Sequence, residues 1–319
     1  MKTSLIAASA VLALTLAAPQ VAVAGCAEFQ ISTTDLSLQY DPFSAAPVER
    51  NFTLRVRRID NAATAVRFLL ADTDTPAGAP RIGKGPSGYD IRWNRDTSRQ
   101  VLVSGAEQPN ATNGALVHFG EGPSGDVVTE TLRFSLPAGQ DAAAGDYYEA
   151  LEARFVCYAG DHALGSTDFQ QGAGLAIDLN VPNRISTYVG ATGIRRGEIA
   201  FGALNPVGGI ASRSLVVTTQ STVPYDIEVS SRWGRLQRRE GDPYGLEYGM
   251  RLSGFPVQSG SMLSCTRTPA PAGRAHPFLV DLAQDQAARV PAGGYSDTVT
   301  LTFTPRAGLS SPDGCSTRL

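Results

Sequence analysis

Lysine and long apolar runs are scarce in this sequence of 319 residues. Lysine occurs only at Lys2 and Lys84, and the formal net charge is −3, so the chain offers no basic field for nucleic acid. Nucleic acid is therefore not an expected partner. After the signal-like N-terminus, no segment is apolar for the roughly 20 residues that a membrane-spanning helix needs. We expect no transmembrane segment in the mature protein.

Motifs for catalysis and cofactor binding are missing or out of context. The histidines His118, His162 and His276 are scattered, and no GxSxG elbow or Cys–His arrangement accompanies them, which gives a hydrolase little support. Two GxGxxG matches, at 83–88 and 120–125, do not connect a buried strand to a helix as a dinucleotide site requires. We expect both to be turns, and we expect neither a cofactor nor enzymatic activity.

Cysteine occurs four times, at Cys26, Cys157, Cys265 and Cys315. An even set in an exported chain indicates disulfides, and the simplest of the three possible connectivities pairs Cys26 with Cys157 and Cys265 with Cys315. No pair has the CxxC or Cys/His spacing of a zinc site. The acidic pair in 72–74 lacks the further oxygen ligands of a calcium loop, so no metal is expected.

The N-terminus has the layout of a secretory signal peptide. Lys2 is followed by an apolar stretch and a run of small residues, so we expect residues 1–24 to be removed during export. An alternative stays open, because residues 23–26 also resemble the lipobox of bacterial lipoproteins, in which the cysteine is acylated. Lipid on Cys26 would leave Cys157 without its partner.

Apolar and polar residues alternate through the rest of the chain, which predicts sandwich strands with one buried face. In the first half, strands are predicted at 52–57, 65–70, 89–93, 100–103, 131–136, 148–158 and 175–181. The pattern then starts again, with strands predicted at 199–202, 214–218, 225–230, 246–252, 278–282 and 298–304. We expect two immunoglobulin-like all-β domains, at 25–182 and 183–319.

The two strand series end differently. In the first half, the long strand 148–158 is followed by a loop and one more apolar strand, 175–181. In the second half, the matching strand 298–304 is followed by a segment rich in Pro and Gly and a polar tail, in which no final strand is predicted. A sandwich without its last strand has an unpaired edge and an uncovered core. We therefore expect another chain to supply that strand.

Several segments resemble the spore coat protein U domain family, the pilin-like domains of archaic chaperone-usher pili. They are Tyr40-Asp41-Pro42-Phe43, residues 199–204, residues 241–251 and, most specifically, the AGGYSDTVTLT segment at 292–302. The resemblance implies three kinds of partner: a periplasmic chaperone, an outer-membrane usher and a neighbouring pilin that donates a strand.

Shaft pilins of that family carry an N-terminal donor segment, whereas the first domain here begins almost at the expected cleavage site, with residues 26–31. The resemblance therefore implies a two-domain tip adhesin at the cell surface, secreted through the periplasm, which attaches cells to an abiotic or host surface. The alternatives are a secreted coat or matrix protein of the same fold, a lipoprotein anchored at Cys26, and an unrecognised hydrolase or lectin.

An immunoglobulin-like path places two loops of the first domain, 159–172 and 60–64, at the pole far from the linker. We expect the adhesive contacts there. The candidate residues are Ile59, Tyr158, His162, Leu164 and Phe169. As an alternative, Tyr158 and Phe169 pack beneath the loop.

Overall fold

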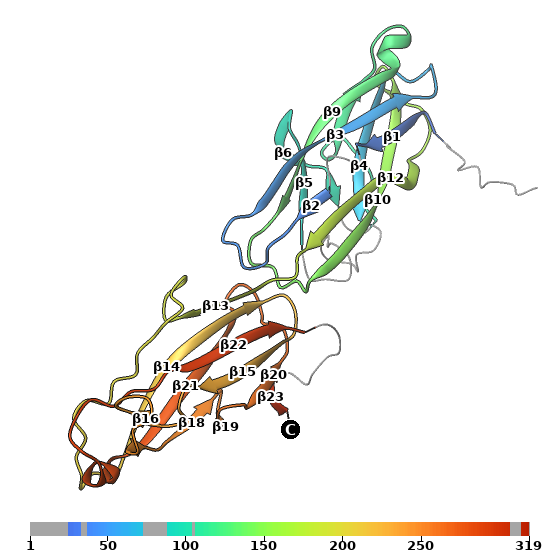
Figure 1. Cartoon of the computed structure of the whole chain (residues 1–319). Helices are drawn as coiled ribbons and strands as arrows, with labels where there is room; N and C mark the ends of the chain where they lie inside the picture. Colours follow the sequence, from blue (N-terminus) through green and yellow to red (C-terminus); the bar gives the residue numbers. More distant parts are fainter. Residues whose placement is uncertain (1–24, 33–36, 73–87, 104–105, 307–313, 319) are drawn as a thin grey trace, which may run out of the picture.

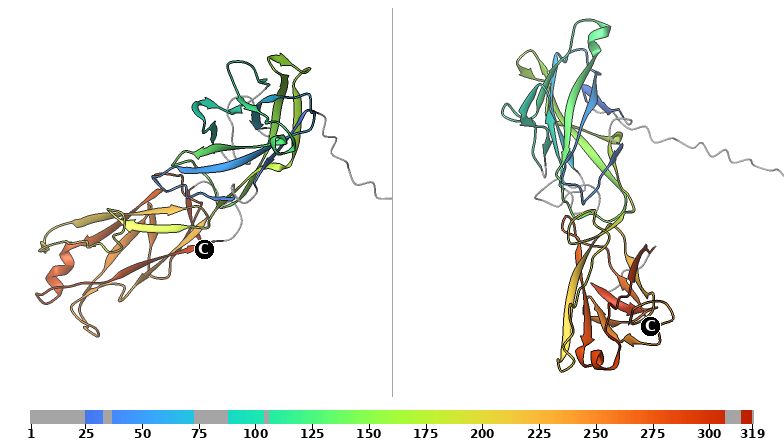
Figure 2. Two further views of the ribbon diagram at one scale, coloured as in Figure 1. Left: turned by 90° about the horizontal axis from the view of Figure 1, so that it is seen from above. Right: turned by 60° about the vertical axis from the view of Figure 1, so that its left-hand side comes forward.

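The computed structural model describes residues 25–32, 37–72, 88–103, 106–306 and 314–318. Almost all regular structure in these residues is β-strand, so the all-β prediction is confirmed. The strands up to residue 181 form one sandwich, called the N-terminal sandwich below, and those from residue 185 form the C-terminal sandwich. The two follow one another along an elongated molecule (Figures 1 and 2). The described residues contain no helix with the length and apolar character needed to cross a membrane.

The N-terminal sandwich has two sheets. The first contains, in spatial order, β1 (Ala27–Ile31), β3 (Val48–Arg58), β9 (Val127–Leu136), β5 (Asp90–Trp93) and β6 (Asp96–Gln100). The second contains β2 (Ser37–Gln39), β12 (Asp168–Val181), β10 (Gly145–Ala159), β4 (Ala65–Asp72) and β7 (Leu102–Val103), with β11 (His162–Ala163) beside β10 and β8 (Ala115–His118) beside β4. A 3-10 turn, η1 (Pro123–Asp126), precedes β9.

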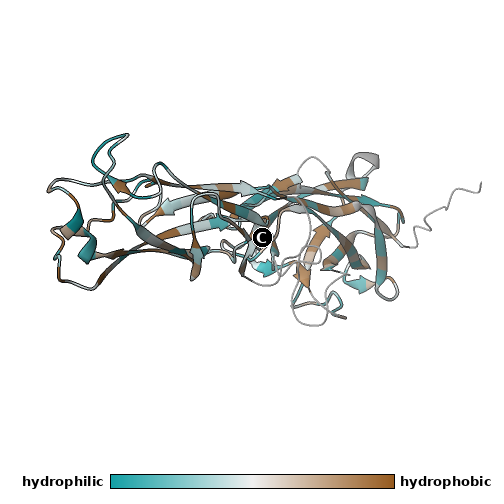
Figure 3. Cartoon of the chain, turned by 60° about the horizontal axis from the view of Figure 1, so that its bottom comes forward, coloured by the Kyte–Doolittle hydropathy of each residue, from teal (hydrophilic) through white to brown (hydrophobic). Residues whose placement is uncertain are grey.

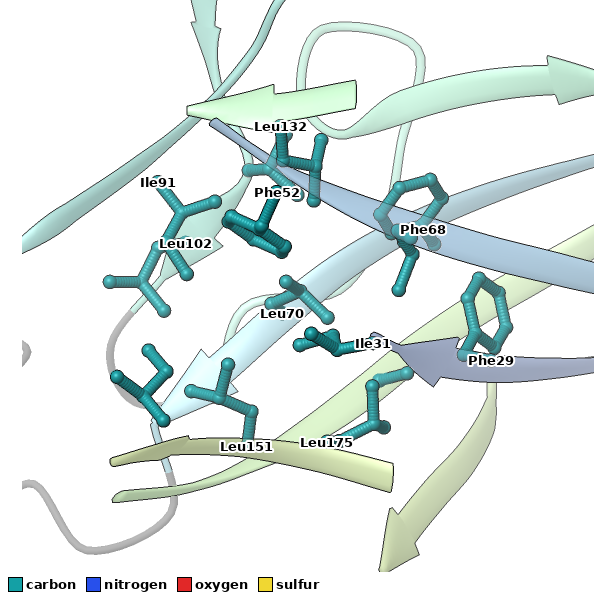
Figure 4. Close-up of a cluster of buried hydrophobic side chains, with 14 of the residues drawn as sticks. Phe29, Ile31, Phe52, Phe68, Leu70, Ile91, Leu102, Leu132, Leu151 and Leu175 are labelled. Carbon is teal, nitrogen blue, oxygen red and sulfur yellow. The ribbon is translucent and has the colours of Figure 1, made fainter. Parts of the chain in front are cut away.

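The core of the N-terminal sandwich follows from the period-two pattern of its strands. In β3, the side chains of Phe52, Leu54 and Val56 are buried, while most of the intervening residues face solvent, as the alternation of a strand requires. The ring of Phe29 lies 5.2 Å from that of Phe68, between centroids. Figure 4 shows the side chains of Phe29, Phe52 and Phe68 between the sheets, and Figure 3 shows apolar residues along the strands of both sandwiches.

Strand β12 closes the N-terminal sandwich on one side. It pairs antiparallel with β10, from Gly145 opposite Val181 to Phe155 opposite Asp168. Its inward side chains are at most 2% exposed; they are those of Leu175, Ile177, Leu179 and Val181. The chain therefore supplies the last strand of its own first sandwich.

The C-terminal sandwich also has two main sheets. One contains, in spatial order, β13 (Ile185–Val189), β14 (Ile210–Ser221), β21 (Arg274–Ala283), β18 (Tyr248–Leu252) and β19 (Phe255–Val257). The other contains β22 (Val299–Pro305), β15 (Tyr225–Ser231), β20 (Met262–Cys265) and β23 (Cys315–Arg318). A small pair, β16 (Leu236–Gln237) and β17 (Gly245–Leu246), and a 3-10 turn, η2 (Gln284–Arg289), complete it.

Two strand predictions and one loop prediction differ from the structure. Residues 199–202 form no strand, because no neighbouring strand pairs with them and Gly202 has a φ of 70°, in the left-handed region. The polar tail does contain a strand, β23, which pairs with β20 next to the Cys265–Cys315 disulfide. The predicted loop before the last strand of the first half is shorter than expected, because β12 already begins at Asp168.

Both disulfides connect the cysteines within each half, so the simplest connectivity is confirmed. Cys26 is bonded to Cys157, and Cys265 is bonded to Cys315. No free cysteine remains. A sulfur in a disulfide has no thiol to carry a lipid, so the structure disagrees with the lipoprotein alternative for Cys26.

The short connection between the two sandwiches is held by Thr222, whose side chain is buried. The Thr222 hydroxyl donates to the carbonyl of Pro182 at 2.8 Å and accepts from the amide of Arg184 at 2.9 Å. The amide of Ala144, in the N-terminal sandwich, donates to the carbonyl of Thr222 at 3.0 Å. One residue thus fixes the connection to both sandwiches.

Two Arg–Asp pairs join the sandwiches beside this connection. Arg184 pairs with Asp41, and Arg267 makes a bidentate pair with Asp141, with 2.9 Å between Nη2 and Oδ2. The hydrogen bonds from Arg267 are the largest cause that holds the pKa of Asp141 below its usual value. Bidentate pairing fixes orientation as well as distance, so the joint has a defined geometry.

Candidate functional site

The candidate site is a groove along β22 in the C-terminal sandwich, with a volume of about 1400 Å³. Strand β22 forms one wall, and residues 195–204 with the end of β13 form the other. The floor comes from apolar side chains of β14 and β21, among them Leu215, Phe278 and Val280. A groove of this shape and lining suits an extended apolar segment.

Strand β22 is an edge strand on the groove side. Its other side pairs with β15, from Tyr225 opposite Pro305 to Ser231 opposite Val299. Among the described residues no strand pairs with its groove side. Its inward side chains, Val299, Leu301 and Phe303, are only half-buried, whereas the corresponding faces of β10 and β12 are covered. An exposed apolar edge of this kind favours pairing with another strand.

The opposite wall, residues 195–204, also has free backbone groups. Within the part of the chain that the structure describes, no backbone–backbone hydrogen bond involves these residues. Ile199 and Phe201 nevertheless pack against the core of the C-terminal sandwich, and Leu204 lines the groove. The groove is therefore bordered on both sides by backbone that a strand between them would satisfy.

Tyr248 and Asp297 form the polar end of the groove, which they both line. The Tyr248 hydroxyl donates to Asp297 Oδ2 at 2.6 Å. Burial, and secondly the hydrogen bond to Asp297, raise the pKa of Tyr248 well above its usual value. Tyr248 thus remains a protonated donor at neutral pH.

Four of the five predicted adhesive residues lie around the Cys26–Cys157 disulfide, at the end of β10 opposite to the end that pairs with Val181 beside the joint. The amide of Ile59 donates to the carbonyl of Cys26 at 2.7 Å, and the amide of Leu164 donates to that of Cys157 at 2.8 Å. Ile59 and Leu164 are 40% and 36% exposed. His162 is exposed and Tyr158 is half-buried.

Phe169, the fifth predicted adhesive residue, lies in a strand and not in the predicted loop. It belongs to β12, opposite Arg154 of β10, and its side chain is 51% exposed. The alternative that Phe169 packs beneath the loop is therefore wrong, and so is its assignment to the loop. The reason is that the β10–β12 pairing extends beyond the apolar stretch from which the strand was predicted.

Sequence reasoning missed a third loop at the same pole, residues 119–126. The amide of Phe119 donates to the carbonyl of Thr64 at 2.9 Å. Arg58 pairs with Asp126 and lies over the Phe119 ring, 5.6 Å from its centroid. This loop contains the second GxGxxG match, which is a turn between two strands, as predicted. Its glycine content was the only sequence signal that it is a loop. No feature of residues 119–126 predicts which other loops they contact.

The remaining candidate chemistry gives no catalytic arrangement among the described residues. His276 lies close to Cys265 and Cys315, but both sulfurs are in a disulfide and are not the thiolates that a metal site uses. His118 and His162 lie at different strand ends. Asp72 ends β4, whereas Asp74 and most of the 83–88 match lie outside the described residues.

Comparison with protein-family models and with curated proteins found no match, so the resemblance to the spore coat protein U domain stays a prediction. Among solved structures, one similar protein is a chaperone–tip adhesion subunit complex from the archaic chaperone-usher Csu pili of Acinetobacter baumannii. It is 14% identical, with 84% of this chain and 98% of that chain covered and a TM-score of 0.38.

Two further solved structures are similar over most of their length. The CupB6 tip adhesin of Pseudomonas aeruginosa is 11% identical, with 92% and 97% of the two chains covered and a TM-score of 0.42. The CfaE adhesive subunit of CFA/I fimbria of enterotoxigenic Escherichia coli is 14% identical, with 89% and 95% covered and a TM-score of 0.38. At these identities and TM-scores, the function must be argued from the geometry of this chain.

Proposed function

We propose that this chain is the adhesive tip subunit of a chaperone-usher pilus, and that its C-terminal sandwich accepts a strand donated by the next subunit. The observation that carries the proposal is the difference between the two sandwiches. The groove side of β22 is unpaired among the described residues and its apolar row is half-buried, while β12 occupies the equivalent place beside β10 and its row is buried.

Strand β12 also indicates what the donated strand must look like. Its inward residues are apolar at every second position, at Leu175, Ile177, Leu179 and Val181. A donor with the same spacing would place its apolar side chains over Val299, Leu301 and Phe303, because side chains in a strand alternate between faces. We expect it to lie antiparallel to β22, as β12 lies antiparallel to β10.

The proposed donor would be a central strand and not a new edge. On one side it pairs with β22, and on the other it reaches residues 195–204, whose backbone groups have no backbone partner among the described residues. Pairing on both sides removes two unsatisfied edges at once, and covers the apolar floor of the groove. Before assembly, a periplasmic chaperone would have to protect the same groove.

The proposed position at the end of a fibre is supported by the way strand β1 is used. Strand β1 begins at Ala27, and its Phe29 and Ile31 side chains are 1% exposed in the core of the N-terminal sandwich. Residues 27–31 are therefore committed to their own fold and are not available as a donor strand. A subunit that accepts a strand and donates none ends the fibre after passage through the usher.

Attachment is assigned to the three loops around the Cys26–Cys157 disulfide. They lie at the other end of β10 from the joint, and so face away from the proposed shaft. The exposed Ile59 and Leu164 give this pole apolar contacts, which suit an abiotic or host surface and need no catalysis. The disulfide ties the start of the chain to β10 and thereby supports these loops.

The test uses the mature chain, residues 25–319, with a synthetic peptide that has apolar residues at the spacing of β12. A ligand that binds only the folded state stabilises it by about 2.7 kcal/mol at a concentration of 100 Kd, so the melting temperature of the C-terminal sandwich should rise with peptide concentration. A peptide with serine at the apolar positions should have no effect.

Matched variants on the edge strand separate groove binding from other binding. Leu301→Ser removes an apolar contact that faces the groove, and Thr302→Ser changes the outward face of the same strand. We expect Leu301→Ser to weaken peptide binding and Thr302→Ser to leave it unchanged. A stable monomer whose melting temperature no alternating peptide raises would overturn the proposed function.

A further inference from the structure

The carboxylate of Asp297 accepts four hydrogen bonds immediately before β22 begins. Its Oδ2 accepts from the hydroxyls of Ser231 at 2.5 Å and Tyr248 at 2.6 Å. Its Oδ1 accepts from the amides of Trp233 at 3.2 Å and Thr298 at 2.7 Å. A carboxylate has about four acceptor positions, so all of them are used.

These partners come from both sheets of the C-terminal sandwich. Ser231 ends β15, which lies in the same sheet as β22, whereas Tyr248 begins β18 in the facing sheet. Asp297 and Tyr248 both line the groove. The carboxylate therefore connects the two sheets at the groove, where no described strand closes the gap between them.

Backbone contacts fix the same corner from the other side. Ser296 and Gln237 exchange both amide–carbonyl bonds, at 2.9 and 3.0 Å, and the amide of Arg232 donates to the carbonyl of Thr298 at 3.0 Å. The start of β22 is thus anchored to β16 and to the residue that follows β15, and the Asp297–Tyr248 bond reaches across to β18. From Val299 onward, no strand in the described part of the chain pairs with the groove side.

We propose that Asp297 is the positioning residue of the strand-acceptor groove: it ties the two sheets together at the end where β22 begins, and so keeps the empty groove open and its edge strand in register. This inference rests on the proposed function. The filled groove needs both walls and the edge strand in this arrangement, whereas the empty groove can relax when the link is lost, so loss of the link should lower the affinity for the inserted strand.

A carboxylate suits this position because it can accept from all four partners at once. Asparagine has one acceptor oxygen. If that oxygen keeps the two amide donors, the NH₂ group faces the Ser231 and Tyr248 hydroxyls, which must then accept and lose the acceptor of their own protons. Unpaired polar groups at a half-buried site are costly, and an asparagine side chain at position 297 would leave the hydroxyl proton of Ser231 or Tyr248 without its present acceptor. Because the Tyr248 ring lines the groove, a change in its position changes the shape of the groove.

The test compares Asp297→Asn with Asp281→Asn in the mature chain. Asp281 is a matched carboxylate on β21, where it accepts from Ser212 and Arg251 in a solvent-exposed pair away from the groove. Three quantities are measured for each variant. They are the peptide affinity, by calorimetry; the melting temperature, with and without peptide; and the rate of hydrogen exchange at residues 299–303 in the protein without peptide. Tyr248→Phe, which keeps the ring and removes the hydroxyl contacts to Asp297 and Ser231, serves if Asp297→Asn does not fold.

We expect Asp297→Asn to lower the affinity for the alternating peptide at least tenfold and to speed hydrogen exchange at residues 299–303. Tyr248→Phe should have the same two effects to a smaller extent. Asp281→Asn should have neither effect. A purely structural role would lower the melting temperature equally in empty and filled protein and leave the affinity unchanged, because affinity and differential stability are linked. That result would overturn the positioning role and leave the proposed function intact. Failure of the wild type to bind any alternating peptide would overturn both.

Discussion

Acid should destabilise the C-terminal sandwich through His276. Its side chain is fully buried, with 2.8 Å between Nε2 and the Tyr225 hydroxyl and 2.7 Å between Nδ1 and the Ser253 hydroxyl. Burial, and secondly the charge of Arg274, lower the pKa of His276 from 6.5 to about 4. A neutral imidazole fits this network, and a charged one beside Arg274 does not.

The sign and size of the effect follow from linkage. Between pH 6.5 and about pH 4, the unfolded chain binds a proton at His276 that the folded chain does not. The free energy of unfolding therefore decreases as the pH is lowered through this range. A difference of about 2.5 pKa units at about 1.36 kcal/mol each corresponds to about 3 kcal/mol. This stability is fully present above pH 6.5 and is lost on acidification.

The assay is urea unfolding of the mature chain at several pH values from 7 to 4. A Trp93→Phe background leaves Trp233 as the single tryptophan, so that its fluorescence reports the C-terminal sandwich. In this background, His276→Gln should flatten the pH dependence below pH 6.5. His162→Gln, which changes an exposed histidine of the N-terminal sandwich, should leave it unchanged. Equal pH slopes for the wild type and His276→Gln would refute the reasoning.

Three other predictions concern the joint, the second disulfide and the adhesive pole. Asp141→Asn should loosen the joint between the sandwiches, which X-ray scattering would detect as a wider distribution of molecular dimensions. Acid below the usual carboxyl pKa should loosen the joint of the wild type in the same way, because the pKa of Asp141 is lowered. Replacing both cysteines of the 50-residue disulfide loop by serine should lower the free energy of unfolding by about 4 kcal/mol, measured in urea. Leu164→Asp should reduce attachment to surfaces, while Val207→Asp, at a residue 91% exposed on the C-terminal sandwich, should not; equal attachment by both would move the site elsewhere.

The local pattern of the sequence determined most of the strands and the inequality of the two halves. Alternation over 131–136 or 225–230 is visible residue by residue, because a strand with one buried face needs nothing beyond its own neighbours. The even cysteine count and the apolar run 175–181, with no counterpart after β22, likewise needed no tertiary information. These features suffice for a tandem of β-sandwiches, one complete and one open.

Contacts between distant residues were decided only by the tertiary structure. Residues 199–202 alternate like a strand, yet form none, because a strand also needs a partner and the place beside them is the empty groove. The polar tail lacks strand character but becomes β23, because the disulfide brings it to β20. Asp297, with its partners on two sheets, reads in sequence as one acidic residue of a turn. Its role depends on where the chain folds, which no local pattern contains.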